Sequence, residues 1–208
     1  MAVLLRVDPR RLSLAAIEQA AAAIRRGQIV AIPTDTVYGL AADPFQPAAV
    51  AALLRLKRRP ENQPVLLLVE SLRQVERLAS RLPEGFHRLA ARFWPGPLTI
   101  VLPAATGIPE RITAGTGTVA VRLPGSRVTR ELIRAARVPL TGTSANLSGR
   151  PAAGSAGQVR EQFPCGLAAI VDAGPARSRA PSTLVDLSGE PRILREGAIP
   201  AADVLCLL

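Results

Sequence analysis

The sequence is poor in the residue types that carry much of enzyme chemistry. Its 208 residues include one histidine, two cysteines and only 3% aromatic residues. Cys165 and Cys206 are far apart and flanked by apolar residues, so we expect buried thiols and neither a disulfide nor a zinc site. We expect the histidine, His87, on the surface of a helix, with nothing to orient it as the base of a serine nucleophile. These absences disfavour covalent catalysis, and we predict no metal-binding residues.

Long apolar runs are also absent, although 48% of the residues are hydrophobic. No run approaches the roughly 18 uninterrupted apolar residues of a membrane span. Asp8 and Pro9 stand too early for the apolar region of a secretory signal. A chain of this length and composition can bury a core as one domain. We therefore expect a single domain over residues 1–208, cytoplasmic and without membrane contact.

Arginine, in contrast, is abundant. Lysine and arginine together number 26, all but one of these are arginine, and the net charge is +10. Such a charge favours a polyanionic partner such as nucleic acid, nucleotide phosphates or pyrophosphate, although an arginine-rich solvated surface has the same composition. The one lysine, Lys57, is a compact point charge that serves well against a phosphate. This single lysine indicates either a phosphate-binding site or a lysine retained by chance at the end of a helix.

Short apolar runs alternate with helical periods along the chain. The apolar spacing over 14–24 predicts a helix capped by Ser13, and Pro47 opens a second helix with Lys57 at its C-terminal end. Further helices are predicted at 71–82, 85–93 and 127–137, and strands at 28–32, 65–69, 98–102, 118–123, 139–142, 168–172, 182–187 and 192–195. The interleaving predicts an α/β fold, a single domain with a twisted mixed β-sheet flanked by helices.

Several polar segments offer chemistry but have a simpler alternative. The match to G-x-G-x-x-A at 115–120 precedes a strand, whereas a dinucleotide fingerprint opens a helix, and no P-loop is present. Hydroxyls, an amide and backbone N–H groups at 141–146 suit an anion or a ribose, or form an ordinary turn or cap. The segment 33–40 places the one tyrosine after a buried strand, which a turn alone does not explain. The segment 149–157, rich in Gly, Ala and Ser, is expected to be a loop that can close over a ligand.

Taken together, these segments resemble the YrdC/Sua5 family, the threonylcarbamoyl-AMP synthases, in their short bacterial form. The resemblance covers about residues 13–200, the expected core of the domain. It rests on seven blocks in order, at 33–40 (PTDTVYGL), 57–60 (KRRP), 93–99 (FWPGPLT), 119–124 (VAVRLP), 143–149 (TSANLSG), 181–186 (PSTLVD) and 194–197 (LREG).

This resemblance implies a YrdC/RibB-like fold and a nucleotidyltransferase. Members of the family condense L-threonine, bicarbonate and ATP into threonylcarbamoyl-AMP and pyrophosphate. Mg²⁺ is expected to travel with the triphosphate. The threonylcarbamoyl group is later moved to adenosine 37 of tRNA, which implies a downstream threonylcarbamoyl-transferase complex as a partner.

The resemblance also implies roles for individual residues. Lys57 and Arg59 are the expected catalytic residues. The implied ATP-binding residues are Lys57, Arg59, Thr118, Ser144, Asn146 and Arg195. The implied threonine-binding residues are Thr34, Thr36, Tyr38, Arg122 and Ser182. One departure stands out, because Leu68 occupies a position where many relatives carry a histidine that helps to hold threonine.

Two alternatives belong to other classes. A non-catalytic module that binds double-stranded RNA or tRNA would use the net charge of +10, as some relatives bind double-stranded RNA. Against it, the chain lacks aromatic platforms on which bases stack. The related carbamoyl-adenylate-forming domain of hydrogenase maturation proteins sits in long chains with cysteine-rich zinc modules, which this sequence lacks.

Overall fold

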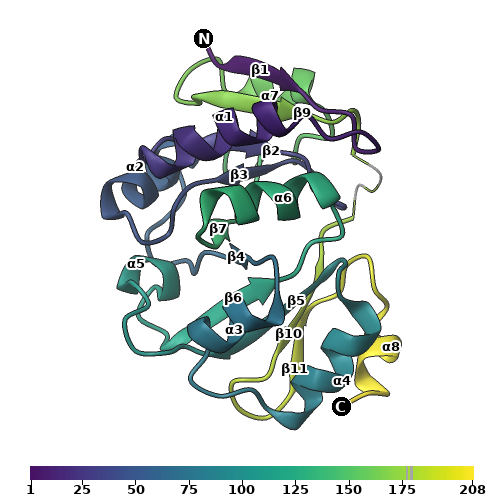
Figure 1. Cartoon of the computed structure of the whole chain (residues 1–208). Coiled ribbons are helices and arrows are strands. Elements are labelled where there is room, and N and C mark those ends of the chain that lie inside the picture. The colour runs from purple at the N-terminus through teal and green to yellow at the C-terminus, as the bar shows by residue number, and fades with distance from the viewer. Residues whose placement is uncertain (177, 179) are drawn as a thin grey trace.

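The structure is a computed structural model that describes residues 1–176, 178 and 180–208 (Figure 1). Its helices are α1 (Leu14–Arg25), α2 (Pro47–Lys57), α3 (Leu72–Leu78), α4 (Glu84–Phe93), α5 (Glu110–Thr113), α6 (Arg127–Ala136), α7 (Ala156–Gln162) and α8 (Ala201–Leu205). Its strands are β1 (Val3–Arg6), β2 (Val30–Ile32), β3 (Gly39–Ala41), β4 (Leu67–Leu68), β5 (Leu98–Pro103), β6 (Thr118–Arg122), β7 (Leu140–Thr141), β8 (Thr143–Ser144), β9 (Ala169–Asp172), β10 (Thr183–Asp186) and β11 (Arg192–Arg195).

The strands form two mixed sheets, one in the upper and one in the lower half of Figure 1. The upper sheet has the order β1-β9-β2-β3-β8, and the lower sheet has the order β11-β10-β5-β6-β4-β7. Each combines parallel and antiparallel pairs: β2 runs parallel to β9 and antiparallel to β3, while β5 runs parallel to β10 and antiparallel to β6. The predicted α/β class with helix-flanked mixed strands is confirmed, but the strands are divided between two sheets instead of one.

The two sheets meet where the chain passes from β7 to β8. β7 pairs with β4 of the lower sheet, and β8, which follows after Gly142 alone, pairs with β3 of the upper sheet. The Gly142 N–H donates to the Leu66 carbonyl oxygen at 2.8 Å. A Cβ atom at Gly142 would lie 2.6 Å from Cγ of Leu68, so the close approach needs a glycine. This crossing brings loops from both sheets to one place.

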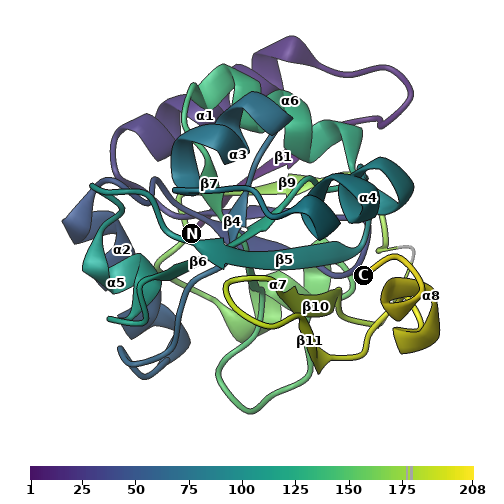
Figure 2. The same ribbon diagram turned by 90° about the horizontal axis from the view of Figure 1, so that it is seen from below.

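Helices cover the sheets and bury their apolar faces. α1 and α6 lie side by side against the upper sheet (Figures 1 and 2). Val30 and Ile32 of β2 pack in the cluster that these two helices share, whereas Ala31 packs in the cluster formed with α2 and α7. Alternate residues of a strand point to opposite faces, so both faces of β2 are covered. A third cluster joins α3, α4 and α8 to the lower sheet.

The predicted cap of α1 and both predicted ends of α2 are confirmed. Ser13 caps α1, with its Oγ accepting from the Ala16 N–H, and Pro47 and Lys57 are the first and last residues of α2. His87 is exposed on α4. The prediction of buried thiols was wrong, because Cys165 lies in an exposed bend after α7 and Cys206 is exposed at the end of α8. In the described part of the chain, no helix is long and apolar enough to cross a bilayer.

Candidate functional site

Lys57 joins the end of α2 to the loop that follows β8. Lys57 as a whole residue is only 2% exposed to solvent. The Nζ atom donates to the carbonyl oxygens of Ser144 and Asn146, the latter at 2.8 Å, and lies 3.4 Å from Asn146 Oδ1. An ammonium group has three N–H donors, so these acceptors engage all of them. The lone lysine therefore fixes the position of the loop that carries the expected nucleotide-binding serine and asparagine.

The same loop is held from within. The Ser144 hydroxyl donates to Asn146 Oδ1 at 2.5 Å, and Asn146 Nδ2 donates to the carbonyl oxygens of Leu147 and Arg150 at 3.0 and 2.7 Å. The Lys57 carbonyl oxygen also accepts from the Ser148 N–H at 3.0 Å. The structure therefore brings together Lys57, Ser144 and Asn146, residues from two distant blocks of the sequence.

Two cations lie together at the end of α2. Burial, followed by the charge of Arg59, lowers the pKa of Lys57 from 10.5 to about 8. Burial also lowers the pKa of Arg59, whose Nη2 donates to the Pro64 carbonyl oxygen at 2.9 Å while its Nε is buried without a partner among the described residues. Within the described part of the chain, no carboxylate forms a salt bridge with either cation. Such a place favours an anionic ligand.

The lone lysine makes its own titration measurable. With ¹³C at lysine Cε, the protein gives one side-chain signal, and we expect its midpoint near pH 8. Because the unfolded chain keeps the higher pKa, this group's contribution to the free energy of unfolding rises with pH between about 8 and 10.5. The control is the same protein in denaturant, which should titrate near 10.5. A midpoint near that value in the folded protein would contradict the burial of the ammonium.

A second polar group surrounds Arg122 at the end of β6. This residue is 3% exposed. Two nitrogens of its guanidinium donate hydrogen bonds, and the third, Nη2, has an ion pair but no hydrogen bond among the described residues. Nε donates to the Gly96 carbonyl oxygen at 3.0 Å, Nη1 donates to Thr36 Oγ1 at 3.0 Å, and Nη2 lies 2.7 Å from Asp35 Oδ1. The Thr36 hydroxyl in turn lies 3.0 Å from that of Thr34. Arg122, Thr36 and Thr34 are thus connected by polar contacts.

Asp35 was missed by the sequence analysis. It forms a close ion pair with Arg122, but the angle is not that of a hydrogen bond, and neither carboxylate oxygen accepts one from the described residues. Its carboxylate packs against Gly125, where a Cβ atom would lie 3.1 Å away. The sequence feature that could have identified Asp35 is an acidic residue between two threonines, soon after a buried strand.

Arg195 and Ser182 form the lower edge of this group. Arg195 Nη2 donates to the Ser182 carbonyl oxygen at 2.9 Å and lies 3.3 Å from its Oγ. The Ser182 hydroxyl lies 2.7 Å from that of Thr99 on β5. Burial and the neighbouring charge of Arg122 lower the pKa of Arg195. The two arginines therefore face the same region from β6 and β11.

The Lys57 group and the Arg122 group meet at the β3–β8 pair. Gly39 of β3 pairs with Ser144 of β8. A Cβ atom at Gly39 would lie 3.3 Å from the Thr143 carbonyl oxygen and 3.7 Å from Cγ2 of Thr34. Thr34, which belongs to the Arg122 group, therefore lies beside the strand that carries Ser144. The candidate site is this crossing between the two sheets.

The side chains of Thr118, Tyr38 and Leu68 make their contacts elsewhere than in the two polar groups described above. Thr118 begins β6, with its hydroxyl 2.8 Å from that of Thr116. Tyr38 is 0% exposed in the core beneath α2 and α7, and its hydroxyl donates to the Gly174 carbonyl oxygen at 2.7 Å. Leu68, in register with Arg122 on the neighbouring strand, packs in the core with α1 and α6. Leu68 thus places an apolar side chain at the position where the sequence resemblance implies a histidine in many relatives.

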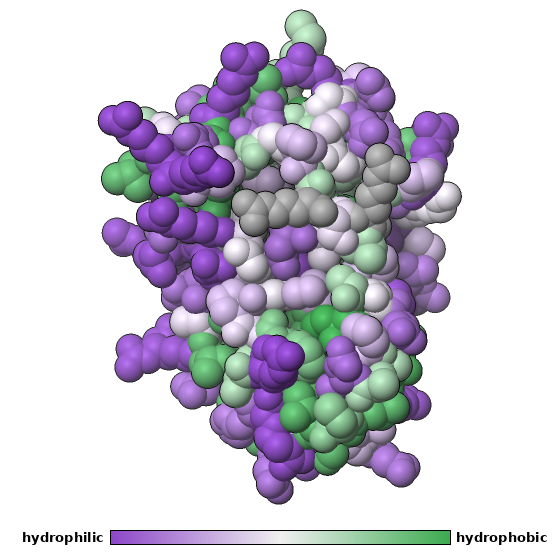
Figure 3. All heavy atoms as spheres, turned by 90° about the vertical axis from the view of Figure 1, so that its right-hand side faces the viewer, coloured by the Kyte–Doolittle hydropathy of each residue, from purple (hydrophilic) through white to green (hydrophobic). Residues whose placement is uncertain are grey.

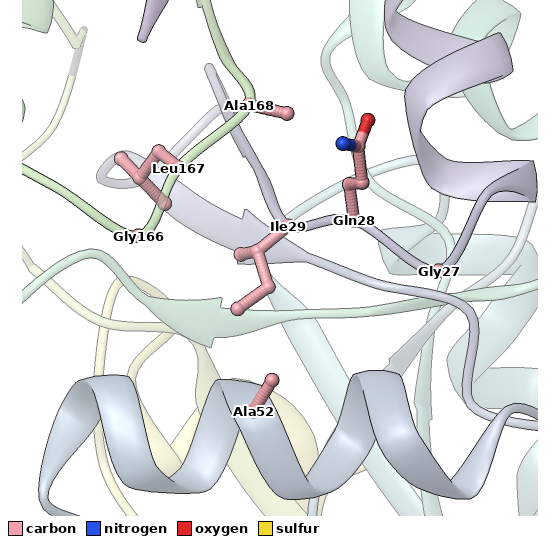
Figure 4. A pocket seen from close by; sticks show the side chains of 7 residues that line it. All are labelled: Gly27, Gln28, Ile29, Ala52, Gly166, Leu167 and Ala168. Atoms are coloured by element: carbon pink, nitrogen blue, oxygen red, sulfur yellow. The ribbon is translucent and has the colours of Figure 1, made fainter. Parts of the chain in front are cut away.

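Of the hollows in the described part of the chain, one borders the candidate site. A cavity of about 230 Å³ is walled by Thr34 and Asp35, and its other lining residues are Pro9, Pro33, Gly125, Ser126, Arg127, Val128, Ala173, Gly174, Pro175 and Ala176. Another hollow, of about 290 Å³, lies among Gly27, Gln28, Ile29, Ala52, Gly166, Leu167 and Ala168 (Figure 4). Neither charged side chains nor expected site residues line it, so we place the chemistry at the crossing.

Comparison with known proteins identifies the family. A family model described as "Telomere recombination", named for Sua5, YciO and YrdC, matches residues 22–197. The chain belongs to the Sua5/YciO/YrdC family. The threonylcarbamoyl-AMP synthase of Pyrococcus abyssi is 42% identical over 189 residues, which make up 90% of this chain and 56% of that protein. The threonylcarbamoyl-AMP synthase of Thiobacillus denitrificans is 40% identical over 79% of this chain and 87% of its own length.

Solved structures of the Sua5/YciO/YrdC family share the fold. The structure of P. abyssi Sua5 complexed with L-threonine superposes with a TM-score of 0.94 and 39% identity, and covers 100% of this chain and 61% of that chain. This chain therefore spans a little over half of the length of the Pyrococcus protein. The expected fold family is confirmed, while the roles of the individual site residues remain expectations.

Proposed function

We propose that the chain is a threonylcarbamoyl-AMP synthase, which forms threonylcarbamoyl-AMP and pyrophosphate from ATP, L-threonine and bicarbonate. One observation carries the proposal. The cations at the end of α2, the Ser144–Asn146 loop and the Arg122 group converge on one crossing, in a chain about 40% identical to synthases of that name. Catalysis here relies on orientation and on fixed charges rather than on a covalent intermediate.

The two groups suit the two kinds of substrate. Lys57 and Arg59 would hold the nucleotide phosphates, with Thr118, Ser144, Asn146 and Arg195 completing the nucleotide site. The N–H groups of Lys57 are already hydrogen-bonded to the Ser144–Asn146 loop. We therefore assign the direct contact with the phosphates to Arg59 before Lys57. Arg122, Thr34, Thr36 and Ser182 would hold threonine.

The reaction needs two bonds to form in sequence. The threonine amine adds to CO2 derived from bicarbonate and loses a proton, which gives a carbamate. A carbamate oxygen then attacks the α-phosphorus of ATP as the bond to the leaving pyrophosphate breaks. Fixed cations that face the phosphates stabilise the charge that builds there.

Mg²⁺ would enter as part of the ATP complex and supply charge neutralisation on the triphosphate. Among the residues that the structure describes, no group of three or more His, Cys, Asp or Glu side chains could hold a metal ion. The one carboxylate described at the crossing, that of Asp35, is paired with Arg122. The other site residues there are cations, hydroxyls and amides, which fit phosphate oxygens rather than a magnesium cage. The protein's part is therefore to orient the nucleotide.

Incubating the protein with ATP, bicarbonate and L-threonine tests the proposal. We expect pyrophosphate release that needs all three substrates, together with an adenylate whose mass is that of threonylcarbamoyl-AMP. Omitting threonine is the decisive control, because a simple ATP pyrophosphatase would ignore it. Pyrophosphate release at the same rate without threonine would refute the assignment.

The wider setting belongs to the same proposal. The product would serve t⁶A37 formation on tRNA through a separate threonylcarbamoyl-transferase complex in the cytoplasm.

RNA binding without catalysis is the alternative function, favoured by the net charge of +10. On the face shown in Figure 3, strongly hydrophilic side chains project most densely at the upper left, while apolar ones gather in the lower half. RNA affinity that falls steeply with salt and survives loss of Lys57, without any adenylate, would favour the alternative.

A further inference from the structure

Tyr38, the one tyrosine of the chain, ties three separate loops together. Its backbone N–H donates to the Ala153 carbonyl oxygen at 2.9 Å, and its own carbonyl oxygen accepts from the Ala145 N–H at 2.7 Å. Its hydroxyl donates to the Gly174 carbonyl oxygen at 2.7 Å. The Ala153 N–H donates to the Ala145 carbonyl oxygen at 3.0 Å, which links the first two loops directly. One residue therefore connects the Ser144–Asn146 loop, the loop before α7 and the loop after β9.

The hydroxyl and the backbone of Tyr38 act on different sides of the site. The backbone holds Ala145, which lies between Ser144 and Asn146 on the nucleotide side. The hydroxyl holds the segment 173–176, which lines the same 230 Å³ cavity as Thr34 and Asp35. The side chain thus supports a wall of the cavity that Thr34, an expected threonine-binding residue, also lines.

The hydroxyl contact belongs to a small, partly buried network. Asp172 Oδ1 accepts from the Gly174 N–H at 3.0 Å and lies 3.4 Å from the Tyr38 hydroxyl. The Ala176 N–H donates to the Gly154 carbonyl oxygen at 2.8 Å, which fixes the far end of the segment. Burial, then the charge of Asp172, raises the pKa of Tyr38 to about 12. The hydroxyl therefore stays protonated and keeps its role as a donor.

We propose that Tyr38 is a positioning residue whose hydroxyl holds the 173–176 wall and so sets the fit of the amino-acid substrate, but not of the nucleotide. A ring that is 0% exposed offers no surface to a ligand, so Tyr38 acts on threonine through Gly174 and not by contact. This inference rests on the proposed synthase function. It replaces the expectation that Tyr38 itself lines the pocket.

Tyr38→Phe isolates the hydroxyl, because it keeps the ring and every backbone hydrogen bond. One net hydrogen bond corresponds to about a tenfold change at most. We therefore expect the KM for L-threonine to rise about five- to tenfold, with the KM for ATP and kcat within about twofold of the parent. By hydrogen exchange, the Gly174 and Ala176 amides should exchange several-fold faster, whereas the Ala145 amide should not change.

The matched control is Thr113→Val. It also removes a buried hydroxyl that donates to a backbone carbonyl oxygen, that of Glu110 at 3.2 Å, but in α5, at a residue with no expected ligand role. We expect both KM values to stay unchanged in this variant. An unchanged threonine KM in Tyr38→Phe, or an equal rise in the KM for ATP, would overturn the inference.

The exchange data separate this inference from the proposed function. If the parent protein makes no threonylcarbamoyl-AMP, the proposed function fails, and with it the link between the wall and threonine. Faster exchange at Gly174 and Ala176 would then still establish the hydroxyl as the support of the wall. Unchanged exchange at these amides overturns the positioning role whatever the activity.

Discussion

A Lys57→Arg protein is expected to keep its fold and net charge but to lose about 100-fold or more of its kcat/KM for threonylcarbamoyl-AMP formation, the scale of a lost charge-stabilising donor. The Lys57 ammonium is closed in by oxygens of Ser144 and Asn146. A guanidinium is longer and planar, so it cannot offer three donors from one point. Fitting it therefore displaces the loop that carries the nucleotide-binding side chains.

Two further variants sharpen this test. Arg55→Lys changes an exposed cation in the last turn of the same helix. It should keep activity within about twofold, since a solvated charge on the surface contributes little. Lys57→Met keeps an unbranched side chain but removes the donors, so it should lose both activity and stability. Circular dichroism and chemical denaturation establish whether each variant is folded. Full activity in folded Lys57→Arg would mean that the lone lysine has no special role.

The fold was predictable where local patterns decide it. α1 and α2 were found because apolar periodicity, Ser13 and Pro47 act over one helix. The division into two sheets was not, because it depends on β3 and β8, which have three and two residues and no alternating pattern. Such short strands form only because a partner strand is already in place.

The candidate site was predictable only through the family resemblance. Lys57 and Ser144 are 87 residues apart, and no periodicity in the sequence shows that they touch. Two details differ from what the blocks suggested. Tyr38 is buried and acts from behind the site, and Asp35 neutralises Arg122. Both depend on packing between distant segments, which a single sequence does not reveal.

The largest expected effect on stability follows from breaking the Arg122–Asp35 pair. Arg122→Met should lower the free energy of unfolding by about 3–5 kcal/mol, because it leaves the Asp35 carboxylate without its counter-ion inside the protein. The side chains of this pair are 4% and 18% exposed. Chemical denaturation measures the change. The same variant should lose the use of threonine, since Arg122 also holds Thr36.

An ion pair on the surface provides the control. Arg111 of α5 lies 3.1 Å from Glu61, and the two side chains are 44% and 68% exposed. Arg111→Met should therefore cost less than about 1 kcal/mol, because solvent screens the pair and replaces its contacts. Equal losses from Arg122→Met and Arg111→Met would contradict the importance of burial.

The double variant Asp35→Asn/Arg122→Met separates the structural from the chemical role of the pair. Removing both charges leaves no buried ion, so most of the stability lost in Arg122→Met should return. Activity should not return, because the arginine expected to bind threonine is still missing. Recovery of both would show that Arg122 serves the fold alone. Recovery of neither would show that an amide cannot occupy the place of the Asp35 carboxylate against Gly125, and that Asp35 is required for its shape as well as for its charge.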